Sequence, residues 1–262
     1  MEYLVLMKHV PKFTRVQLDP ITHNLLRDGM RMIINPADLN ALTMAIQLKR
    51  QTGGSITILT MGPERAADMI KEAIAMGADK GYVLSGGTFR GSDTLATSYA
   101  LSSAIKHIGE FDVILAGAQT IDGDTGQVGP EVAEFLGINQ ATYLKDAKYK
   151  DGSFEVLREL SSNVEKQVVK APVLFTVVRE CNEVKKVSKE KIESISDDLI
   201  KFISDEDAGM DSEQLGVSGS PTVVKEVFAH QNRATGLLLE GNIEEQVNKL
   251  VEVLKADGII GR

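Results

Sequence analysis

Several residue types are scarce in this chain of 262 residues, and each scarcity excludes a kind of protein. The sequence contains no tryptophan, four histidines and one cysteine, Cys181. A lone cysteine cannot form an internal disulfide, and the scattered histidines lack the spacing of structural metal ligands. The sequence therefore predicts neither a disulfide scaffold nor a metal site.

Long apolar runs and an excess of positive charge are also missing. No run approaches the ~20 apolar residues of a membrane-spanning helix. The chain starts directly with a strand-like segment, YLVLM, rather than with a signal-peptide layout. The net charge of -8 argues against a nucleic-acid partner, because nucleic-acid binding normally shows as a basic excess. We therefore expect a cytoplasmic protein without a membrane span.

The remaining composition, 43% hydrophobic and 25% charged, is that of a globular protein. Apolar segments typical of buried parallel strands lie at residues 3–7, 56–59, 80–84 and 111–115. Amphipathic segments between them are typical of helices, with Asn35 suited to an N-cap and Pro36 to a first helical position. This alternation predicts an α/β fold, a doubly wound and mostly parallel sheet with helices on both faces.

The second half of the chain changes pattern. Residues 142–170 contain three alternating polar and apolar segments, which predict an antiparallel meander, and residues 173–178 are expected to rejoin the main sheet. An exposed hairpin is predicted over residues 16–26. Residues 195–227 show no period, which favours an extended arm, and residues 243–254 form an amphipathic helix pattern. We divide the chain into an α/β domain, residues 1–193, and an arm with a terminal helix, residues 194–262.

The most informative stretch is ILAGAQTIDGDTGQVGP, residues 114–130, where an apolar run gives way to small, hydroxyl and acidic residues. Its glycines permit backbone conformations and close approaches that a Cβ would obstruct. Pro130 suits the first position of a helix, so backbone amides of residues 126–129 would converge on an anion at the positive helix end. The stretch predicts a phosphate-binding loop without a Walker lysine.

Six segments resemble the β subunit of electron-transfer flavoproteins. They are MKHVP at 7–11, INPAD at 34–38, MGP at 61–63, AMGADKGYVL at 75–84, AGAQTIDGDTGQVGP at 116–130 and VRECNEVKKVSKEKIE at 178–193. Six motifs in order are a strong signal. The resemblance implies an adenine nucleotide α-hydrolase-like fold in a subunit that forms a heterodimer with a flavin-carrying α subunit. It also implies that the arm and the last helix pack on that partner.

The resemblance further implies an adenine-nucleotide site, with residues carried over one by one. They are Leu6, Lys8, Asn35, Pro36, Ala37, Asp38, Met61, Gln119, Thr120, Asp122, Gly123, Asp124, Thr125, Gly126, Gln127 and Val128. Asn35 would cap a helix and Met61 would pack in any case. Asp122 and Asp124 suit turn formation equally well. Beside a diphosphate we expect these acids to bond ribose hydroxyls or backbone amides, because like charges repel.

Members of the family differ in the nucleotide that the β subunit holds. One group holds AMP as a structural ligand, and the electron-bifurcating group holds FAD, which takes a hydride from NADH and sends its two electrons along separate paths. Gly123, Thr125 and Gly126 resemble the FAD group, because AMP-binding relatives carry bulkier, more acidic residues there. The implied cofactor is FAD, with NADH as donor. Ferredoxin and a flavin dehydrogenase, of acyl-CoA or 2-hydroxy acid type, are the implied partners.

Two other readings of the function remain. The chain could be an AMP-holding subunit of a single-FAD carrier for an acyl-CoA or similar dehydrogenase. It could also be a nucleotide-binding regulatory module without a redox role, since one fold hosts many functions. No side chain is predicted to be catalytic, because a flavin would carry the chemistry and the protein would position it.

Charged pairs outside the loop have two interpretations. As cross-strand ion pairs, Arg158-Glu159 and Arg179-Glu180 would contribute ~0.2–1 kcal/mol each. The resemblance instead places the Glu159 region near the partner's flavin and makes Arg179 a candidate cation beside a flavin. Residues 182–191 correspond to the loop through which relatives recognise a dehydrogenase. This chain lacks the proline and leucine anchor of that loop, and a solvated lysine face is the alternative.

Overall fold

The computed structural model describes residues 1–12, 31–225, 236 and 238–261. These residues belong to two units, a main body that ends near residue 225 and a C-terminal unit that contains the last helix. Each unit is described by itself below. The hairpin predicted over residues 16–26 lies outside the described residues.

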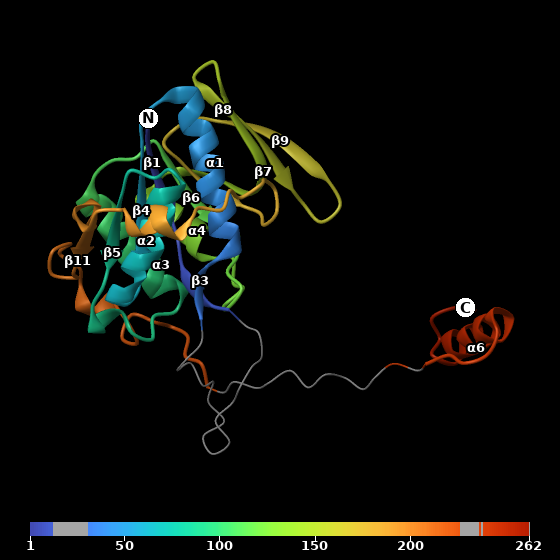
Figure 1. Ribbon diagram of the computed structural model, residues 1–262. Helices are drawn as coiled ribbons and strands as arrows, with labels where there is room; N and C mark the ends of the chain where they lie inside the picture. The colour runs from blue at the N-terminus through green and yellow to red at the C-terminus, as the bar shows by residue number, and fades with distance from the viewer. Residues whose placement is uncertain (13–30, 226–235, 237, 262) are drawn as a thin grey trace. The chain divides into compact units, whose positions relative to one another are not determined.

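The main body is built on a nine-stranded sheet with the order β11-β5-β4-β1-β6-β10-β7-β8-β9 (Figure 1). From β11 to β7 in this order all neighbours are parallel, whereas β7, β8 and β9 pair antiparallel. The strands are β1 Glu2–Leu6, β4 Ser55–Met61, β5 Lys80–Leu84, β6 Val113–Gly117, β7 Asn139–Lys150, β8 Ser153–Glu159, β9 Val164–Val169, β10 Val173–Val177 and β11 Ile200–Ile203. A separate antiparallel pair joins β2, His9–Pro11, to β3, Met32–Ile34.

Helices cover both faces of this sheet, as the sequence predicted. The longer ones are α1 Pro36–Thr52, α2 Ala67–Met76, α3 Thr94–Ile108 and α4 Val128–Leu136. Successive side chains of β1 alternate between the faces. Tyr3 and Val5 pack in a core cluster with residues of α1 and α2, while Leu4 and Leu6 pack in a second cluster with residues of α3 and α4. The doubly wound α/β prediction is confirmed.

The antiparallel meander is also present, but it is continuous with the main sheet. Strand β7 begins at Asn139, earlier than the pattern indicated, and its first residues pair in parallel with β10. The register shifts between Phe175 and Val177 on β10 and between Leu144 and Asp146 on β7. Strand β10 rejoins the sheet between β6 and β7, as predicted.

Residues 200–222, which the sequence placed in an extended arm, lie on the main body. Strand β11 pairs in parallel with β5, and Leu215 is buried in the second core cluster. Asp93 caps α3 through Oδ1, which accepts from the N–H of Ala96, and its Oδ2 accepts from the N–H and hydroxyl of Thr222. We call residues 204–222 the strap. Short helical turns complete the body: α5 Lys189–Glu193 and the 3-10 helices η1 Glu64–Ala66, η2 Gly87–Phe89, η3 Asp197–Leu199 and η4 Ser212–Gln214.

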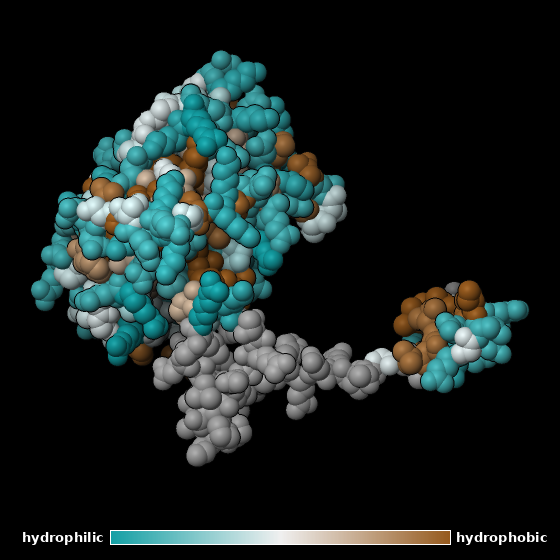
Figure 2. All heavy atoms as spheres, in the orientation of Figure 1, coloured by the Kyte–Doolittle hydropathy of each residue, from teal (hydrophilic) through white to brown (hydrophobic). Residues whose placement is uncertain are grey.

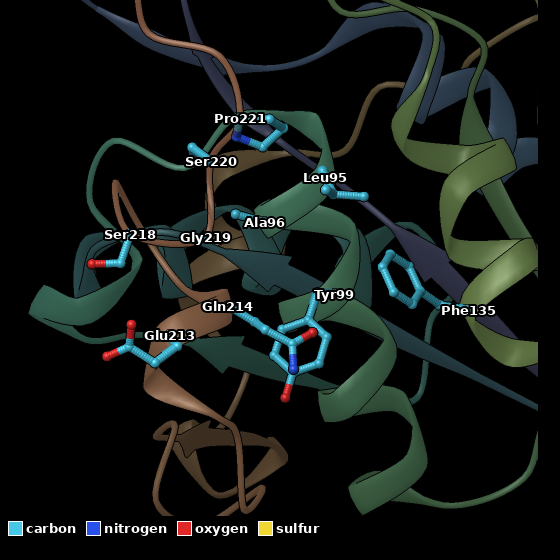
Figure 3. Close-up of a pocket in the computed structure, with 10 residues that line it drawn as sticks. All are labelled: Leu95, Ala96, Tyr99, Phe135, Glu213, Gln214, Ser218, Gly219, Ser220 and Pro221. Carbon is cyan, nitrogen blue, oxygen red and sulfur yellow. The ribbon is translucent and has the colours of Figure 1, made fainter.

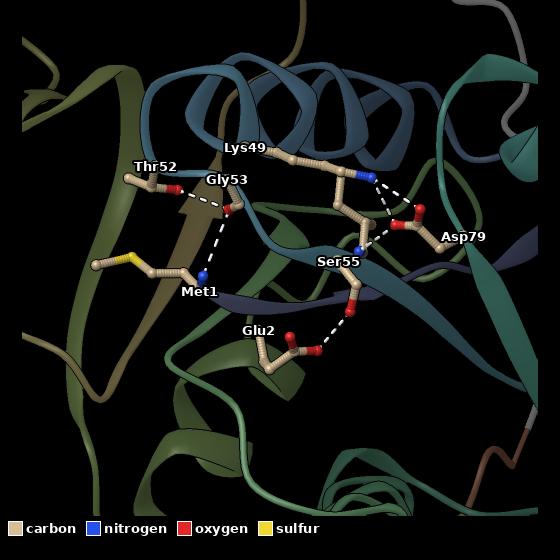
Figure 4. Close-up of polar contacts among 8 residues, drawn as sticks. Met1, Glu2, Lys49, Thr52, Gly53, Ser55 and Asp79 are labelled. Carbon is tan, nitrogen blue, oxygen red and sulfur yellow. Dashed lines mark hydrogen bonds and ion pairs between the residues drawn. The ribbon is translucent and has the colours of Figure 1, made fainter.

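Polar contacts close the amino ends of the central strands (Figure 4). Lys49 of α1 forms an ion pair with Asp79 at 2.7 Å, and Asp79 also accepts from the N–H of Ile56 at 2.6 Å. The N-terminal amino group donates to the carbonyl of Gly53 at 3.4 Å. Since this end of the sheet is occupied by its own contacts, a ligand site is expected at the carboxyl ends.

The C-terminal unit contains α6, Ile243–Ala256, a well-capped amphipathic helix. Asn242 and Glu245 form a reciprocal capping box at its start. One face is apolar and exposed, with Ile243 at 81%, Val247 at 52% and Leu250 at 45% exposure. Figure 2 shows apolar surface gathered over this helix. Among the described residues no helix is long and apolar enough to cross a membrane.

Candidate nucleotide site

The four segments predicted to touch a nucleotide meet at one edge of the sheet. Strands β1, β4 and β6 are parallel, and Leu6 pairs with both Leu59 and Ala116. Their carboxyl ends therefore lie at one level, and the chain leaves them through Lys8, Met61 and the loop after Gly117. The start of α1 reaches the same edge through the contacts described next.

Asp38, in the first turn of α1, connects two of these strand ends. Its carboxylate is only 4% exposed. Oδ2 accepts from the N–H of Lys8 at 2.7 Å, and Oδ1 accepts from the N–H of Gly117 at 3.1 Å and from Nδ2 of Asn35 at 2.8 Å. Burial raises the pKa of Asp38 to about 7, although these donors and the charge of Lys8 act to lower it.

Asn35 extends this hold into the loop after β6. Its Nδ2 also donates to the carbonyl of Gln119 at 3.0 Å, and its Oδ1 accepts from the N–H of Ile121 at 3.2 Å. Asn35 occupies the N-cap position of α1, and Pro36 follows at the first helical position as predicted. A capping role for the Asn35 side chain is wrong, because within the described residues it caps no helix amide and bonds to the loop instead.

Gly117 is required by this close approach. A Cβ built on Gly117 would clash with Oδ1 of Asp38 and would lie 2.8 Å from the Cβ of Ala37. The residue needs no unusual backbone conformation, so the requirement is one of space alone. Any larger residue at position 117 must displace the Asp38 carboxylate.

The tip of the loop is tied back to the end of β1. Nζ of Lys8 lies 2.7 Å from Oδ2 of Asp122. Burial raises the pKa of Asp122, but Lys8 and the Thr120 side chain lower it further, so the pKa lies below its ordinary value. The N–H of Asp124 donates to the carbonyl of Thr120 at 2.9 Å, and Asp124 has φ +52°. The backbone of Asp124 thus closes a turn, while the Asp122 side chain contacts Thr120 and Lys8; contact of either acid with a nucleotide stays a prediction.

The rest of the loop forms an open surface. Its exposed residues are Gln119, Ile121, Asp122, Gly123, Asp124, Thr125 and Gln127. A Cβ on Gly123 would meet only the Thr120 hydroxyl, at 3.6 Å, whereas Gly126 has φ +66°. Thr94 of α3 donates to the Gln127 side chain at 3.4 Å. The loop therefore offers room for a ligand beside a backbone that Asn35 and Asp38 fix by hydrogen bonds.

Helix α4 begins at Val128, so Pro130 occupies its third position and the expected first position is wrong. The physical reason is that each position of the first turn leaves its N–H without an intrahelical partner, and proline is tolerated at any of them. The N–H groups of Val128 and Gly129 remain in this first turn. Anion binding there stays a prediction.

Three of the residues predicted to contact the nucleotide, Leu6, Ala37 and Met61, have side chains that are buried or partly buried. A nucleotide could reach them only through their backbone or through few side-chain atoms. Leu6 is 6% exposed and Ala37 5%, and both side chains face the protein interior. Met61 packs against the second core cluster, as expected. These residues shape the floor of the site.

Tyr143 is a neighbour of the loop that the sequence did not reveal. It has φ +58°, unusual for a non-glycine residue, where the pairing of β7 with β10 shifts register. Its N–H donates to the Thr176 hydroxyl at 2.9 Å, and its own hydroxyl would lie 3.3 Å from a Cβ on Gly126. A tyrosine inside an alternating strand pattern gives no signal of this placement.

Comparison with known proteins gives the family. Residues 22–199 match the family model described as the electron transfer flavoprotein domain. The chain is 40% identical over 261 residues to the electron transfer flavoprotein subunit beta of Thermoanaerobacterium thermosaccharolyticum, covering 99% of this chain and 100% of the relative. The chain belongs to the electron-transfer flavoprotein β-subunit family.

Two further relatives carry different names. The caffeyl-CoA reductase-Etf complex subunit CarD of Acetobacterium woodii is 38% identical over 262 residues, covering 99% of this chain and 100% of the relative. Protein FixA of Azorhizobium caulinodans is 40% identical over 242 residues, covering 89% of this chain and 86% of the relative. The resemblance drawn from the six motifs is confirmed.

In this family member the charged pairs of the meander are structural. Arg158 of β8 lies 3.0 Å from Glu165 of β9, directly across the strand pair, and also donates to the carbonyl and hydroxyl of Thr142. Glu159 lies 3.4 Å from Lys145. Arg179 pairs with its chain neighbour Glu180 at 2.8 Å rather than across strands. Roles beside a flavin stay predictions.

The loop after β10 is fastened to α1. Nδ2 of the buried Asn40 donates to the carbonyl and side-chain oxygens of Asn182, and Nδ2 of Asn182 donates back to the carbonyl of Asn40 at 3.0 Å. Burial raises the pKa of the neighbouring Cys181 thiol, which fits an inert role. The start of the 182–191 segment is thus fixed, and its recognition of a dehydrogenase stays a prediction.

A hollow of about 340 Å³ lies elsewhere on the main body (Figure 3). Leu95, Tyr99 and Phe135 line one side, and Glu213 and Gln214 of the strap line another. None of its lining residues belongs to the 119–127 loop. Among the described residues there is no group of acidic, histidine or cysteine side chains that could hold a metal ion.

Proposed function

We propose that this electron-transfer flavoprotein β subunit holds FAD against the 119–127 loop and works in a complex that takes electrons from NADH. Ferredoxin and a flavin dehydrogenase, of acyl-CoA or 2-hydroxy acid type, are the proposed acceptors. The observation that carries the proposal is the open, glycine-containing loop at the carboxyl ends of the parallel strands. The proposed compartment is the cytoplasm.

The residues at this edge fit an adenine nucleotide. Around Gly123, a Cβ would meet only the Thr120 hydroxyl of the described residues, at 3.6 Å, which leaves room beside the loop. Lys8, with a side chain 48% exposed, supplies a cation, and the first turn of α4 supplies backbone N–H groups that a helix leaves without an intrahelical partner. When bound, FAD supplies the redox chemistry, and the chain binds and orients the nucleotide.

The proposed main partner is a flavin-carrying α subunit. The apolar face of α6 is exposed over Ile243, Val247 and Leu250, which is unusual for a helix of a self-sufficient chain. The relatives are themselves named as subunits. We propose that the segment after residue 225, with α6, packs on the α subunit.

One observation favours AMP as the alternative ligand. The loop carries two acids, and Asp122 already pairs with Lys8 at 2.7 Å. Because Lys8 is already paired, fewer groups are available to contact phosphate oxygens, and AMP has one phosphate to contact where FAD has two. In that case the chain would be the AMP-holding subunit of a single-FAD carrier for an acyl-CoA or similar dehydrogenase.

Counting nucleotides in the purified heterodimer decides between these functions. The chain is coexpressed with its α subunit, denatured with acid, and FAD and AMP are quantified by chromatography. Two FAD and no AMP per heterodimer support the proposal. One FAD with one AMP overturns it in favour of the single-FAD carrier, and a chain that binds neither flavin nor α subunit would be a regulatory module.

A further inference from the structure

We propose that Asp38 is a positioning residue for the nucleotide site, which fixes the backbone of residues 117–121 without touching the nucleotide. Asn35 connects Asp38 to the rest of the loop through further hydrogen bonds. The inference rests on the proposed nucleotide site but applies equally to FAD and to AMP.

The first step is the position of the carboxylate between two strand ends. Oδ2 accepts a hydrogen bond from the N–H of Lys8, just after β1, and Oδ1 accepts one from the N–H of Gly117, the last residue of β6. Pairing between β1 and β6 ends at Leu6 and Ala116, so these two N–H groups lie just beyond the last paired residues of the two strands. A buried N–H without a partner destabilises the fold, and a carboxylate is an acceptor that can serve both N–H groups.

The second step is the relay through Asn35. This side chain is fully buried, donates to the Asp38 carboxylate and to the Gln119 carbonyl, and accepts from Ile121. An asparagine amide can satisfy both a carbonyl and an N–H of the loop only in one orientation. The bond to Asp38 selects that orientation, because the carboxylate can only accept from Nδ2.

The third step is that the carboxylate has no side free for a nucleotide. Three N–H donors occupy its two oxygens, and it is 4% exposed beneath the loop. In its ionised form, this carboxylate would also repel a phosphate. The first turn of α1 is a favourable place for it, because the helix dipole stabilises negative charge there.

The test compares three variants in the intact αβ complex by hydrogen–deuterium exchange. Asp38→Asn keeps the size of the side chain but turns an N–H₂ group toward N–H donors. Gly117→Ala keeps the aspartate at position 38 but adds a Cβ that must displace its carboxylate. Gly62→Ala is the matched control, because this glycine also follows a strand of the same sheet and its Cβ would meet only Ala66, at 3.7 Å.

Both D38N and G117A should speed exchange at residues 8, 117 and 121 about tenfold or more, the effect of losing a hydrogen bond to a charged group. Bound nucleotide should fall in parallel. The N–H of Ala118 donates to Val177 at 2.8 Å and serves as an internal reference that stays protected, as should β8 and β9. G62A should match the wild type.

Nucleotide loss with unchanged exchange in the loop would overturn the inference, because it would make Asp38 a direct ligand contact. Unchanged exchange and unchanged nucleotide would overturn it as well. If D38N does not fold, the exchange rates and the nucleotide content of G117A alone test the inference. Exchange in the loop does not depend on which nucleotide is bound, so AMP in the wild-type complex would remove the FAD proposal and leave this inference standing.

Discussion

Gly126 shows how a single residue couples the loop to its surroundings. Its φ of +66° lies in the left-handed region, where side chains with a Cβ are strained. A Cβ there would also lie 3.3 Å from the Tyr143 hydroxyl and 3.4 Å from the Ala118 carbonyl. Both effects are local to the predicted ligand surface, so a substitution should act on binding more than on the sheet.

We predict that Gly126→Val abolishes nucleotide retention while the sheet stays folded. The matched control is Gly152→Val, at φ +79° in the turn between β7 and β8, where nothing lies within 4 Å of a built Cβ. Both variants should lose about 1–2 kcal/mol of stability from backbone strain. Only G126V should lose nucleotide, measured after denaturation. Equal nucleotide content in the two variants would contradict the loop assignment.

Asp38 should make stability depend on pH near neutrality. Its pKa in the folded protein is about 7, above the ordinary 3.8, so the folded state keeps the proton to higher pH than the unfolded state. Its contribution to stability is therefore complete below about pH 4 and is lost as pH rises through about 7. Lys8, whose charge acts to lower the pKa of Asp38, is paired with Asp122.

The free energy of unfolding of the wild type minus that of D38N should therefore decrease between about pH 4 and about pH 8. Denaturant titrations at several pH values in this window measure it. A constant difference would show that Asp38 does not titrate there.

At the scale of elements, α3 depends on the strap as well as on its own sequence. The two carboxylate oxygens of Asp93 serve separate partners, the helix amide of Ala96 and the strap residue Thr222. Burial raises the pKa of Asp93, but its hydrogen bonds lower it further, so the group is charged at neutral pH. One acid thus caps a helix and anchors a segment distant in sequence.

We predict that Asp93→Ala destabilises the protein by more than Asp93→Asn. Asparagine is a good N-cap and keeps the bond to Ala96, whereas alanine loses about 1 kcal/mol of capping together with the anchor. Both variants should become more sensitive to proteolysis near residue 222, and thermal unfolding should separate them. If D93N and D93A have equal melting temperatures, the cap contributes nothing.

The sequence predicted the elements whose pattern is long and periodic. The strands from β1 to β10 in the main sheet, and α1 to α4, appear where apolar spacing placed them. Strand β11 was missed because it has four residues, of which only Ile200 and Ile203 are buried. The start of β7 was missed because its first residues, Asn139 and Gln140, are polar and exposed.

The site was predictable in its location but not in its internal bonding. Parallel strands and turn residues place the loop at their carboxyl ends. The bonds of Asn35 and Asp38, however, run to backbone atoms of residues 8, 117, 119 and 121, and no side-chain pattern in those residues records them. The bulge at Tyr143 is likewise a product of pairing between β7 and β10.

At the scale of the whole molecule, the chain consists of a body with its own core and a helix that buries no residue in the described structure. A helix of 14 residues is marginal alone in water, so the apolar face of α6 needs a partner surface. The proposed α subunit supplies that surface.

We predict that Leu250→Asp weakens association with the α subunit by about tenfold or more, because it places a charge on the apolar face. Asn248→Asp is the control, with the same new residue and charge change on the polar side of α6. The melting temperature of the full chain without the α subunit should not change in either variant, because neither position lies in the main body. Equal affinities of the two variants, measured by titration of labelled chains, would contradict the proposed contact.

The hydrogen bonds that fix the loop backbone have a consequence for how the loop sequence can vary. Within the loop, the hydrogen bonds of Asn35 and Asp38 run to main-chain atoms, so apart from the glycine at 117 they place no demand on which side chains the loop carries. Residues 122–125 can therefore be exchanged in evolution or design while the frame beneath stays constant. On this view, the side chains that select the ligand can vary independently of the hydrogen bonds that set the shape of the loop. Grafting residues 122–125 of a relative onto this chain should transfer the relative's nucleotide preference.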